Sequence, residues 1–219
     1  MSTARHPKFF APLKRRAAYS KKADGSFYSY RYYREHFQIE IVEDCAQRCV
    51  YCDSHEDEAG GREAMQLDHF RPYTRTGFEN LENDPCNFHH ACGRCNLLKS
   101  DKWPSTHATQ PHDGIVGFID PFTDDRSRYL VVNADGEIVP KIGPAPYLIR
   151  VLALNRRLLK LQRQQRIFRM LLNDYEAKNH SRWEAAACGN ASEKELQEVA
   201  IEFAEYRRLR QLSSPNFKE

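Results

Sequence analysis

The stretch from Cys49 to Lys102 decides the fold of this chain, because it combines metal-ligand spacing with residues suited to catalysis. It contains two Cys-x-x-Cys knuckles, an acidic residue followed by a histidine between them, and two asparagines. In order, the motifs are Cys49-Val50-Tyr51-Cys52, Leu67-Asp68-His69-Phe70 and Asn87-Phe88-His89-His90-Ala91-Cys92-Gly93-Arg94-Cys95-Asn96. Scaffold and chemistry can therefore be argued from one segment.

The two knuckles predict a structural zinc site. A Cys-x-x-Cys turn places both sulfurs on one side of a tight loop, and zinc prefers four tetrahedral ligands. A reduced or redox-active pair is the alternative, but it does not explain why the pair recurs. Cys45 and Cys86 are predicted to be core cysteines, although neither is excluded as a ligand. The predicted ligands are Cys49, Cys52, Cys92 and Cys95.

The bulk composition indicates a globular chain with a large solvated surface. The 219 residues are 41% hydrophobic and 29% charged, which suits one modest domain with an appended region or two small domains. The seven cysteines are an odd number and no signal-peptide hydrophobic region precedes them, which argues against a disulfide framework. We therefore expect a cytoplasmic protein with paired cysteines for metal binding and no membrane partner.

The distribution of charge says more than the net charge of +3. Residues 1–22 contain seven Lys or Arg and no acid, and residues 141–173 contain eight and again no acid. Basic stripes of this kind are typical of phosphate binding. The alternative is a solvated surface face together with a disordered tail.

Periodicity and turn signals predict an α+β fold in three regions. These are a basic N-terminal arm over 1–27, a knuckle-bearing domain over 28–119, and a small hairpin with a helical accessory region over 120–219. The apolar spacing over 30–47 predicts a helix, with a strand as the alternative. Short strands are expected over 65–70 and 86–91, a helix over 93–102 and a hairpin near an Asp135-Gly136 turn. Asn155 is predicted to cap a helix, and Ser192 with Glu195 to form a capping box for the last one.

The residues between the knuckles suit hydrolysis of a phosphodiester. His69 has a near-neutral pKa and can take a proton from the attacking water as a general base. Asp68 and Asn96 offer hard oxygen ligands for Mg²⁺ or Mn²⁺, which neutralises charge on the attacked phosphate. Asn87 is predicted to hold the loop of His69 by bonding to its backbone. A lone Asp-His pair is more often a surface or capping pair, so the catalytic interpretation depends on the surrounding knuckles.

Together these motifs resemble an HNH (His-Me finger) endonuclease of the four-cysteine type. The resemblance implies a ββα-metal fold, with His69 as general base, Asp68 and Asn96 as ligands of the catalytic cation, and Asn87 as the residue that orients the loop. It also implies that Lys99 contacts phosphate. His89 and His90 stand where the family often has aliphatic residues. They are predicted to be one buried and one exposed strand residue, with phosphate or metal binding as the alternative.

A narrower resemblance extends beyond the motifs. His69-Phe70-Arg71-Pro72, Ile119-Asp120-Pro121-Phe122 and Leu154-Asn155-Arg156 are similar to segments of small HNH proteins of bacterial antiphage systems, the Septu and retron-associated nuclease subunits. This implies DNA as substrate and an ATPase subunit as partner.

Basic residues after Asn155 are predicted to anchor the DNA backbone without reading sequence. These predicted anchors are Arg156, Arg157, Lys160 and Arg163. Two rivals to the nuclease interpretation remain: a catalytically silent zinc-scaffolded nucleic-acid-binding module, and a partner-regulated interaction subunit. RNA is a further substrate class, because water attack does not distinguish the two sugars strongly.

Overall fold

The computed structural model describes residues 8–213, which form an α+β arrangement of helices and two small sheets. The described residues pack as two compact units, one of residues 8–162 and a helical one from Arg163 onward. This packing boundary differs from the division at residue 120 that periodicity and turn signals predict. Residues 1–7 of the predicted N-terminal arm lie outside the described part. Among the helices of residues 8–213, none has both the length and the apolar run that crossing a membrane requires.

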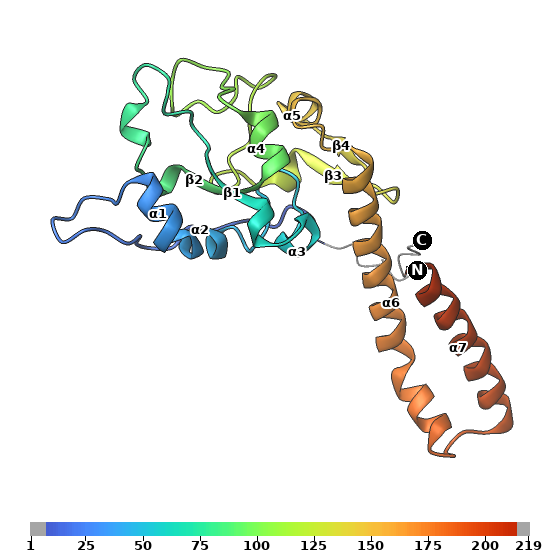
Figure 1. The fold of residues 1–219 in the computed structure, drawn as a ribbon. Coiled ribbons are helices and arrows are strands. Elements are labelled where there is room, and N and C mark those ends of the chain that lie inside the picture. Colours follow the sequence, from blue (N-terminus) through green and yellow to red (C-terminus); the bar gives the residue numbers. More distant parts are fainter. Residues whose placement is uncertain (1–7, 214–219) are drawn as a thin grey trace. The chain divides into compact units, whose positions relative to one another are not determined.

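A two-stranded antiparallel sheet and the helix after it form the centre of the first unit. Strand β1 (Met65–His69) pairs with β2 (Phe88–Cys92), with Asp68 opposite His89 and His69 opposite Phe88. Helix α4 (Gly93–Lys99) follows β2 directly and packs on both strands, as Figure 1 shows. The predicted strand over 86–91 is displaced, because Pro85–Asn87 form a 3₁₀ turn (η3). That turn exposes Cys86, so its prediction as a core cysteine is wrong.

The predicted helix over 30–47 consists of two helices, α1 (Tyr30–His36) and α2 (Gln38–Asp44). The break is at Phe37, whose backbone leaves the helical region (φ −125°, ψ 9°) while its ring packs on those of Tyr28 and Tyr33. Helix α2 lies against β2. The next residue, Cys45, is fully buried, and its Sγ accepts a hydrogen bond from the backbone N–H of His90 at 3.5 Å. Cys45 is therefore the core cysteine that the sequence predicts.

The described part of the N-terminal arm packs on the first unit through its arginines. Arg15 donates to the Phe88 carbonyl and lies 3.9 Å from the centre of the Phe122 ring. Arg16 donates to Asp44 at 3.1 Å and also pairs with Glu43. These two arginines therefore have partners within the first unit, and phosphate binding by the basic run stays a prediction.

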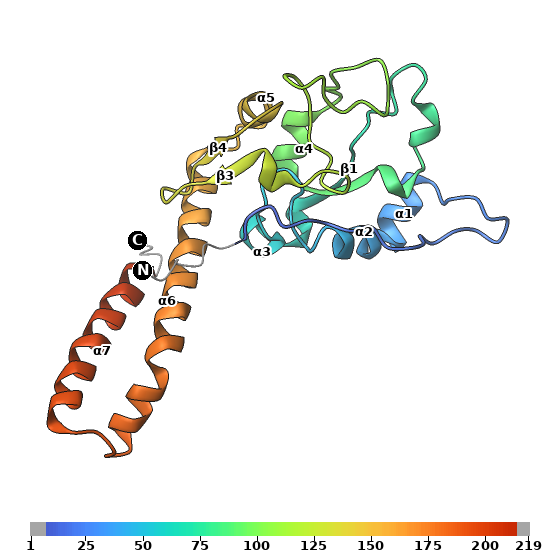
Figure 2. The same cartoon turned by 180° about the vertical axis from the view of Figure 1, so that it is seen from behind.

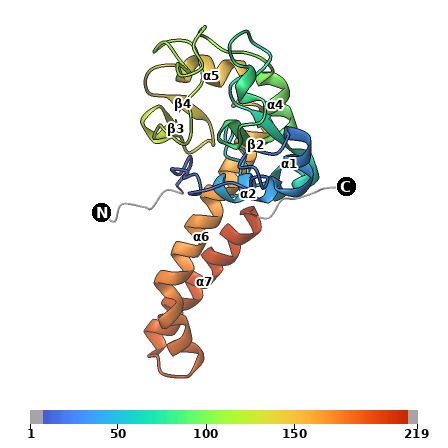
Figure 3. The ribbon, with the colours of Figure 1, turned by 90° about the vertical axis from the view of Figure 1, so that its left-hand side faces the viewer.

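Short elements complete the unit around the central sheet. The polar stretch after the first knuckle contains helix α3 (Glu56–Ala59), and a 3₁₀ turn, η1 (Arg62–Ala64), follows it. Two further 3₁₀ turns are η2 (Glu79–Leu81) and η4 (Arg126–Arg128). The predicted hairpin is confirmed as β3 (Leu130–Val132) with β4 (Ile138–Pro140), and helix α5 (Ala145–Val151) packs on β4 (Figure 3). No strand forms over 115–120, where the structure has only an isolated bridge between His112 and Gly117.

Asn155 does not cap a helix. Its side chain accepts a hydrogen bond from the N–H of Ile138 at 2.8 Å and donates one to the carbonyl of the same residue, also at 2.8 Å. Helix α6 (Arg157–Ala187) begins two residues later. Asn155 therefore satisfies the free edge of β4 instead of a helix end.

The helical unit is an antiparallel pair formed by the later turns of α6 and by α7 (Glu193–Ser213), visible in Figure 2. The predicted capping box is confirmed: the Ser192 hydroxyl accepts from the N–H of Glu195, and the Glu195 carboxylate accepts from the N–H of Ser192. Arg182 of α6 pairs with Glu198 and Glu202 of α7 at 3.0 and 2.6 Å. Aromatic rings pack between the helices; they belong to Tyr175, Trp183, Phe203 and Tyr206.

Replacing Asn155 with Ala should lower the free energy of unfolding by about 1–3 kcal/mol, because the N–H and C=O of Ile138 then lose their partner at a half-buried site. Urea unfolding followed by circular dichroism measures this difference. Asn80→Ala, at an exposed position in η2, is the matched control and should change stability by less than about 0.5 kcal/mol. Equal effects of the two substitutions would contradict the role given to Asn155.

Candidate active site and metal cluster

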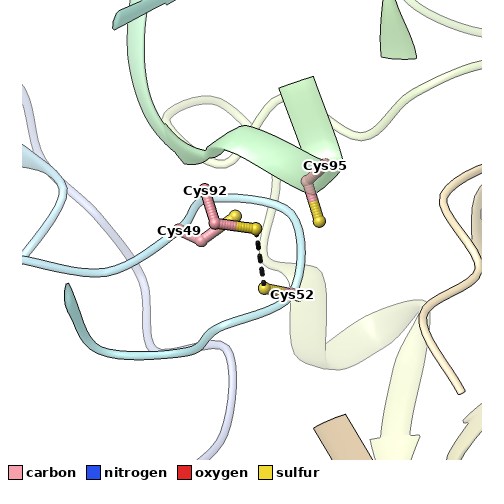
Figure 4. Close-up of side chains that lie close together, drawn as sticks. All are labelled: Cys49, Cys52, Cys92 and Cys95. Carbon is pink, nitrogen blue, oxygen red and sulfur yellow. Dashed lines mark hydrogen bonds between the residues drawn. The ribbon is translucent and has the colours of Figure 1, made fainter. Parts of the chain in front are cut away.

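The four predicted zinc ligands converge. The sulfurs of Cys49, Cys52, Cys92 and Cys95 all lie within 4.8 Å of one another and all four residues are buried. Figure 4 shows one pair on the loop after α2 and the other at the junction of β2 and α4. The Sγ atoms of Cys52 and Cys92 are 3.9 Å apart, close to the roughly 3.8 Å that tetrahedral Zn–S bonds of about 2.3 Å require. Four thiolates at this spacing fit a structural zinc.

Polar groups surround this cluster and suit the negative charge that four thiolates carry. The Arg156 guanidinium lies 3.8 Å from the Sγ atoms of both Cys92 and Cys95. The Ser54 hydroxyl lies 3.5 Å from the Sγ of Cys52. Arg156 therefore faces the four-cysteine cluster, a contact that its prediction as a DNA anchor did not include.

Three of the predicted catalytic residues line one open cleft, with a volume of about 370 Å³. Asp68 and His69 come from the end of β1, and Asn96 comes from the first turns of α4. Because α4 lies directly against β1, residues about 27 apart in sequence reach the same space. Tyr30, Tyr73 and Asp101 also line this cleft.

The ring of His69 is held in one orientation. Its Nε2–H donates to the carbonyl oxygen of Glu82 at 2.8 Å, since a carbonyl can only accept. The rings of Tyr30 and Tyr73 lie 4.4 and 4.5 Å from its centre. Partial burial lowers the pKa of His69 below its ordinary value, which favours the neutral imidazole. With Nε2 protonated, Nδ1 carries the lone pair that a general base needs.

Asp68 is held on both carboxylate oxygens. The Tyr51 hydroxyl donates to Oδ2 at 2.5 Å, and the Lys99 ammonium lies 3.3 Å from Oδ1. Burial raises the pKa of Asp68 above its ordinary value, and the Lys99 charge opposes that shift. Asp68 is 5% exposed.

Lys99 is completely buried, so its prediction as a phosphate contact is wrong. Its Nζ donates to the carbonyl of His69 at 2.6 Å, to the carbonyl of Ser100 at 3.3 Å and to Asp68. Helix α4 ends at Lys99, and the left-handed backbone of Ser100 (φ 51°) turns a carbonyl toward the ammonium. Lys99 is the internal counter-ion of Asp68.

The two asparagines have different surroundings. Asn87 is fully buried: its Oδ1 accepts from the N–H of Arg71 at 2.8 Å, and its Nδ2 donates to the carbonyls of Arg71 and Leu81. These bonds tie both ends of the loop that follows His69, which is the contact predicted for Asn87. Asn96 donates from Nδ2 to Gln66 Oε1 at 2.6 Å, an arrangement that leaves its carbonyl oxygen as the group suited to a hard cation.

Both His89 and His90 are fully buried, so the prediction of one buried and one exposed histidine is wrong. Every side chain of β2 is buried because both faces of that strand are covered. His89 stacks on Phe70 at 4.6 Å, and burial lowers its pKa far below the usual range. His90 Nε2 lies 3.5 Å from Glu56 Oε2, and burial lowers its pKa to about 4. Two neutral core histidines are the result.

The remaining predicted DNA anchors do not form a shared basic face. Lys160 lies 3.6 Å from Glu137, and Arg163 is buried with a partner of its own. Arg157 alone of the four predicted anchors is exposed. The prediction of a four-residue phosphate-binding stripe is therefore wrong for the buried Arg163, and it stays a prediction for Arg156, Arg157 and Lys160.

Sequence reasoning missed two groups that shape the cleft. Tyr51 lies between the two cysteines of the first knuckle, a position whose residue type carries no functional signal in the sequence. Its hydroxyl contacts Asp68 because the fold brings this knuckle next to β1. The Glu82 carbonyl that orients His69 is a backbone atom, which no residue type can signal.

Comparison with protein-family models, with curated proteins and with solved structures finds no match for this chain.

Replacing Cys52 with Ser should remove bound zinc and unfold the region around the knuckles, because three thiolates hold the metal less tightly and the loops lose their cross-link. Metal content by mass spectrometry and near-ultraviolet circular dichroism measure both effects. Cys86→Ser and Cys188→Ser, at exposed positions, are matched controls and should keep wild-type zinc. Zinc retained in full by Cys52→Ser would contradict the four-thiolate site.

Proposed function

We propose that this chain is a metal-dependent endonuclease of the HNH type that hydrolyses phosphodiester bonds in DNA. One observation carries the proposal: Asp68, His69 and Asn96 line a single open cleft beside a four-cysteine cluster. The elements follow in the order β1–β2–α4, with one cysteine pair on the loop before them and the other where β2 turns into α4. This order supports a ββα-metal core with structural zinc.

The orientation of His69 supports its role as general base. The Glu82 carbonyl fixes the Nε2–H tautomer, so the basic Nδ1 is the atom that takes a proton from water. The lowered pKa keeps the ring neutral near pH 7. Asn87 holds the adjoining loop, which limits movement of the ring away from the cleft. His69 is therefore already neutral before the reaction and can activate the water, while Asn87 keeps it in position.

The donor set of the cleft fits a hard divalent cation. Asp68 provides carboxylate oxygens and Asn96 an amide oxygen, the ligand types preferred by Mg²⁺ and Mn²⁺. A cation bound there supplies charge neutralisation to the attacked phosphate and to the departing oxygen. Asp68 and Asn96 are the residues that we propose hold it, beside His69.

DNA is the proposed substrate because it follows from the HNH resemblance, and RNA enters the assay as the competing outcome. The role as an antiphage effector with an ATPase partner is part of the same proposal. If the isolated chain is inactive, the protein encoded by the neighbouring gene is added to the same assay, since a partner-regulated nuclease is silent alone.

Replacing His69 with Ala should slow plasmid nicking about 10²–10⁴-fold in Mg²⁺ or Mn²⁺, because the water loses its general base. The assay uses supercoiled DNA, linear DNA and RNA, each with and without the cation. His107→Ala, an exposed histidine outside the cleft, is the matched control and should cut at the wild-type rate. Zinc content reports that each variant is folded. Undiminished cutting by the folded His69→Ala protein would refute the assignment.

The nicking rate should rise with pH to a plateau, with a midpoint below the ordinary histidine value of 6.5. Burial lowers the pKa of His69, so the ring becomes an active neutral base at a lower pH than a solvated histidine. Single-turnover rates between pH 5 and 8 at saturating Mn²⁺ measure this, with zinc content checked at each pH. A midpoint clearly above 6.5 would contradict a buried neutral base.

A further inference from the structure

A buried ammonium stands directly behind the carboxylate that the proposed function assigns to the cation. Lys99 is fully buried and its Nζ lies 3.3 Å from Asp68 Oδ1. An ammonium has three N–H donors, and here three acceptors meet it: Asp68 and the carbonyls of His69 and Ser100. Because all three of its donors have acceptors, the buried Lys99 ammonium is stably held at this position.

The charges of the buried groups beside the cleft therefore balance before any substrate arrives. The Asp68 carboxylate and the Lys99 ammonium cancel, and both Asn96 and the deprotonated His69 ring are neutral. The cleft has one other lining carboxylate, Asp101, which is exposed and bonded to the Ser100 hydroxyl. Water screens the charge of Asp101, whereas the buried pair is screened much less.

A divalent cation at Asp68 meets the repulsion of Lys99 at short range. One carboxylate oxygen and one amide oxygen give such a cation few protein ligands, and Mg²⁺ is usually held by one or two carboxylates together with substrate phosphates. A phosphodiester adds the negative charge that the Asp68–Lys99 pair does not offer.

We propose that Lys99 makes cation binding depend on substrate: the divalent cation binds the free protein weakly and binds at least tenfold more tightly when the scissile phosphate is present. This inference rests on the proposed nuclease function. Because coupling between two ligands is reciprocal, the cation tightens DNA binding by the same factor. Lys99 is thus a positioning residue that acts through Asp68, not a phosphate contact.

The test measures Mn²⁺ binding directly, using the electron paramagnetic resonance signal of free Mn²⁺. The protein is the His69→Ala variant, so that a bound DNA duplex stays intact. Titrations run with and without the duplex, and the same duplex with His69→Ala/Asp68→Asn protein corrects for Mn²⁺ held by DNA alone. The expected result is a dissociation constant at least tenfold lower with DNA, and DNA binding at least tenfold tighter with Mn²⁺.

Removing the ammonium should strengthen Mn²⁺ binding, whereas a substitution that only damaged the site would weaken it. In the His69→Ala background, Lys99→Met should bind Mn²⁺ at least tenfold more tightly without DNA, because the cation replaces the lost counter-charge of Asp68. The gain from adding DNA should shrink. Lys99→Arg keeps the charge and should keep the dependence on DNA. Lys102→Met removes an exposed lysine three residues away and should match the parent.

The outcomes separate this inference from the proposed function. Tight Mn²⁺ binding without DNA, or a folded Lys99→Met protein that binds Mn²⁺ no more tightly than its parent, overturns the role of Lys99 while leaving catalysis by His69 intact. If Lys99→Met loses its zinc and unfolds, Lys99→Gln, which also removes the charge but keeps a polar head, is titrated in its place and judged by the same two results. Unimpaired cutting by His69→Ala, or absence of Mn²⁺ binding under both conditions, overturns the proposed function as well.

Discussion

Four cysteine sulfurs within 4.8 Å of one another are the constraint on which the first unit depends. Strands β1 and β2 have five residues each, and a hairpin of that size is marginal in water without further packing or a cross-link. The knuckles offer such a cross-link, because a metal ion held by the four cysteine sulfurs would join the loop after α2 to the start of α4. Metal binding at this cluster would then add to the folding energy that the small sheet gains from buried apolar area.

The cluster also places the groups of the cleft, one through each knuckle. Tyr51 belongs to the first knuckle and donates to Asp68, so that knuckle fixes the carboxylate. Asn96 follows the last cysteine of the second knuckle, and Lys99 lies one turn further along the same helix. The spacing between the two proposed cation ligands therefore depends on the distance between the knuckles more than on the segment of residues 71–84.

The sequence predicts those features whose partners are close along the chain or whose chemistry allows one arrangement. The Ser192–Glu195 capping box and the paired cysteines are of this kind. Polar side chains with several suitable partners are not. Asn155 suits a helix cap as well as the edge of β4, and Arg156 suits a phosphate as well as a thiolate. Lys99 looks like a surface lysine on a short helix, and only the packing of α4 on β1 shows that it is buried. In each case a contact between segments distant in sequence determines the role of the side chain, and the local sequence pattern does not encode that contact.

The contacts made by the first residues of α6 and by those just before it limit which insertions this protein tolerates. Asn155 contacts β4, Arg156 faces the sulfurs of the second knuckle, and Gln162 bonds to Ser54 and to the carbonyl of Glu58. These three contacts fall within eight consecutive residues and lie on three different segments. One inserted residue rotates the rest of a helix by about 100° and advances it by about 1.5 Å, so all three cannot be kept at once. An insertion here should disrupt the unit, whereas the exposed pair Ala134–Asp135 in the turn between β3 and β4 can lengthen without disturbing the four-cysteine cluster.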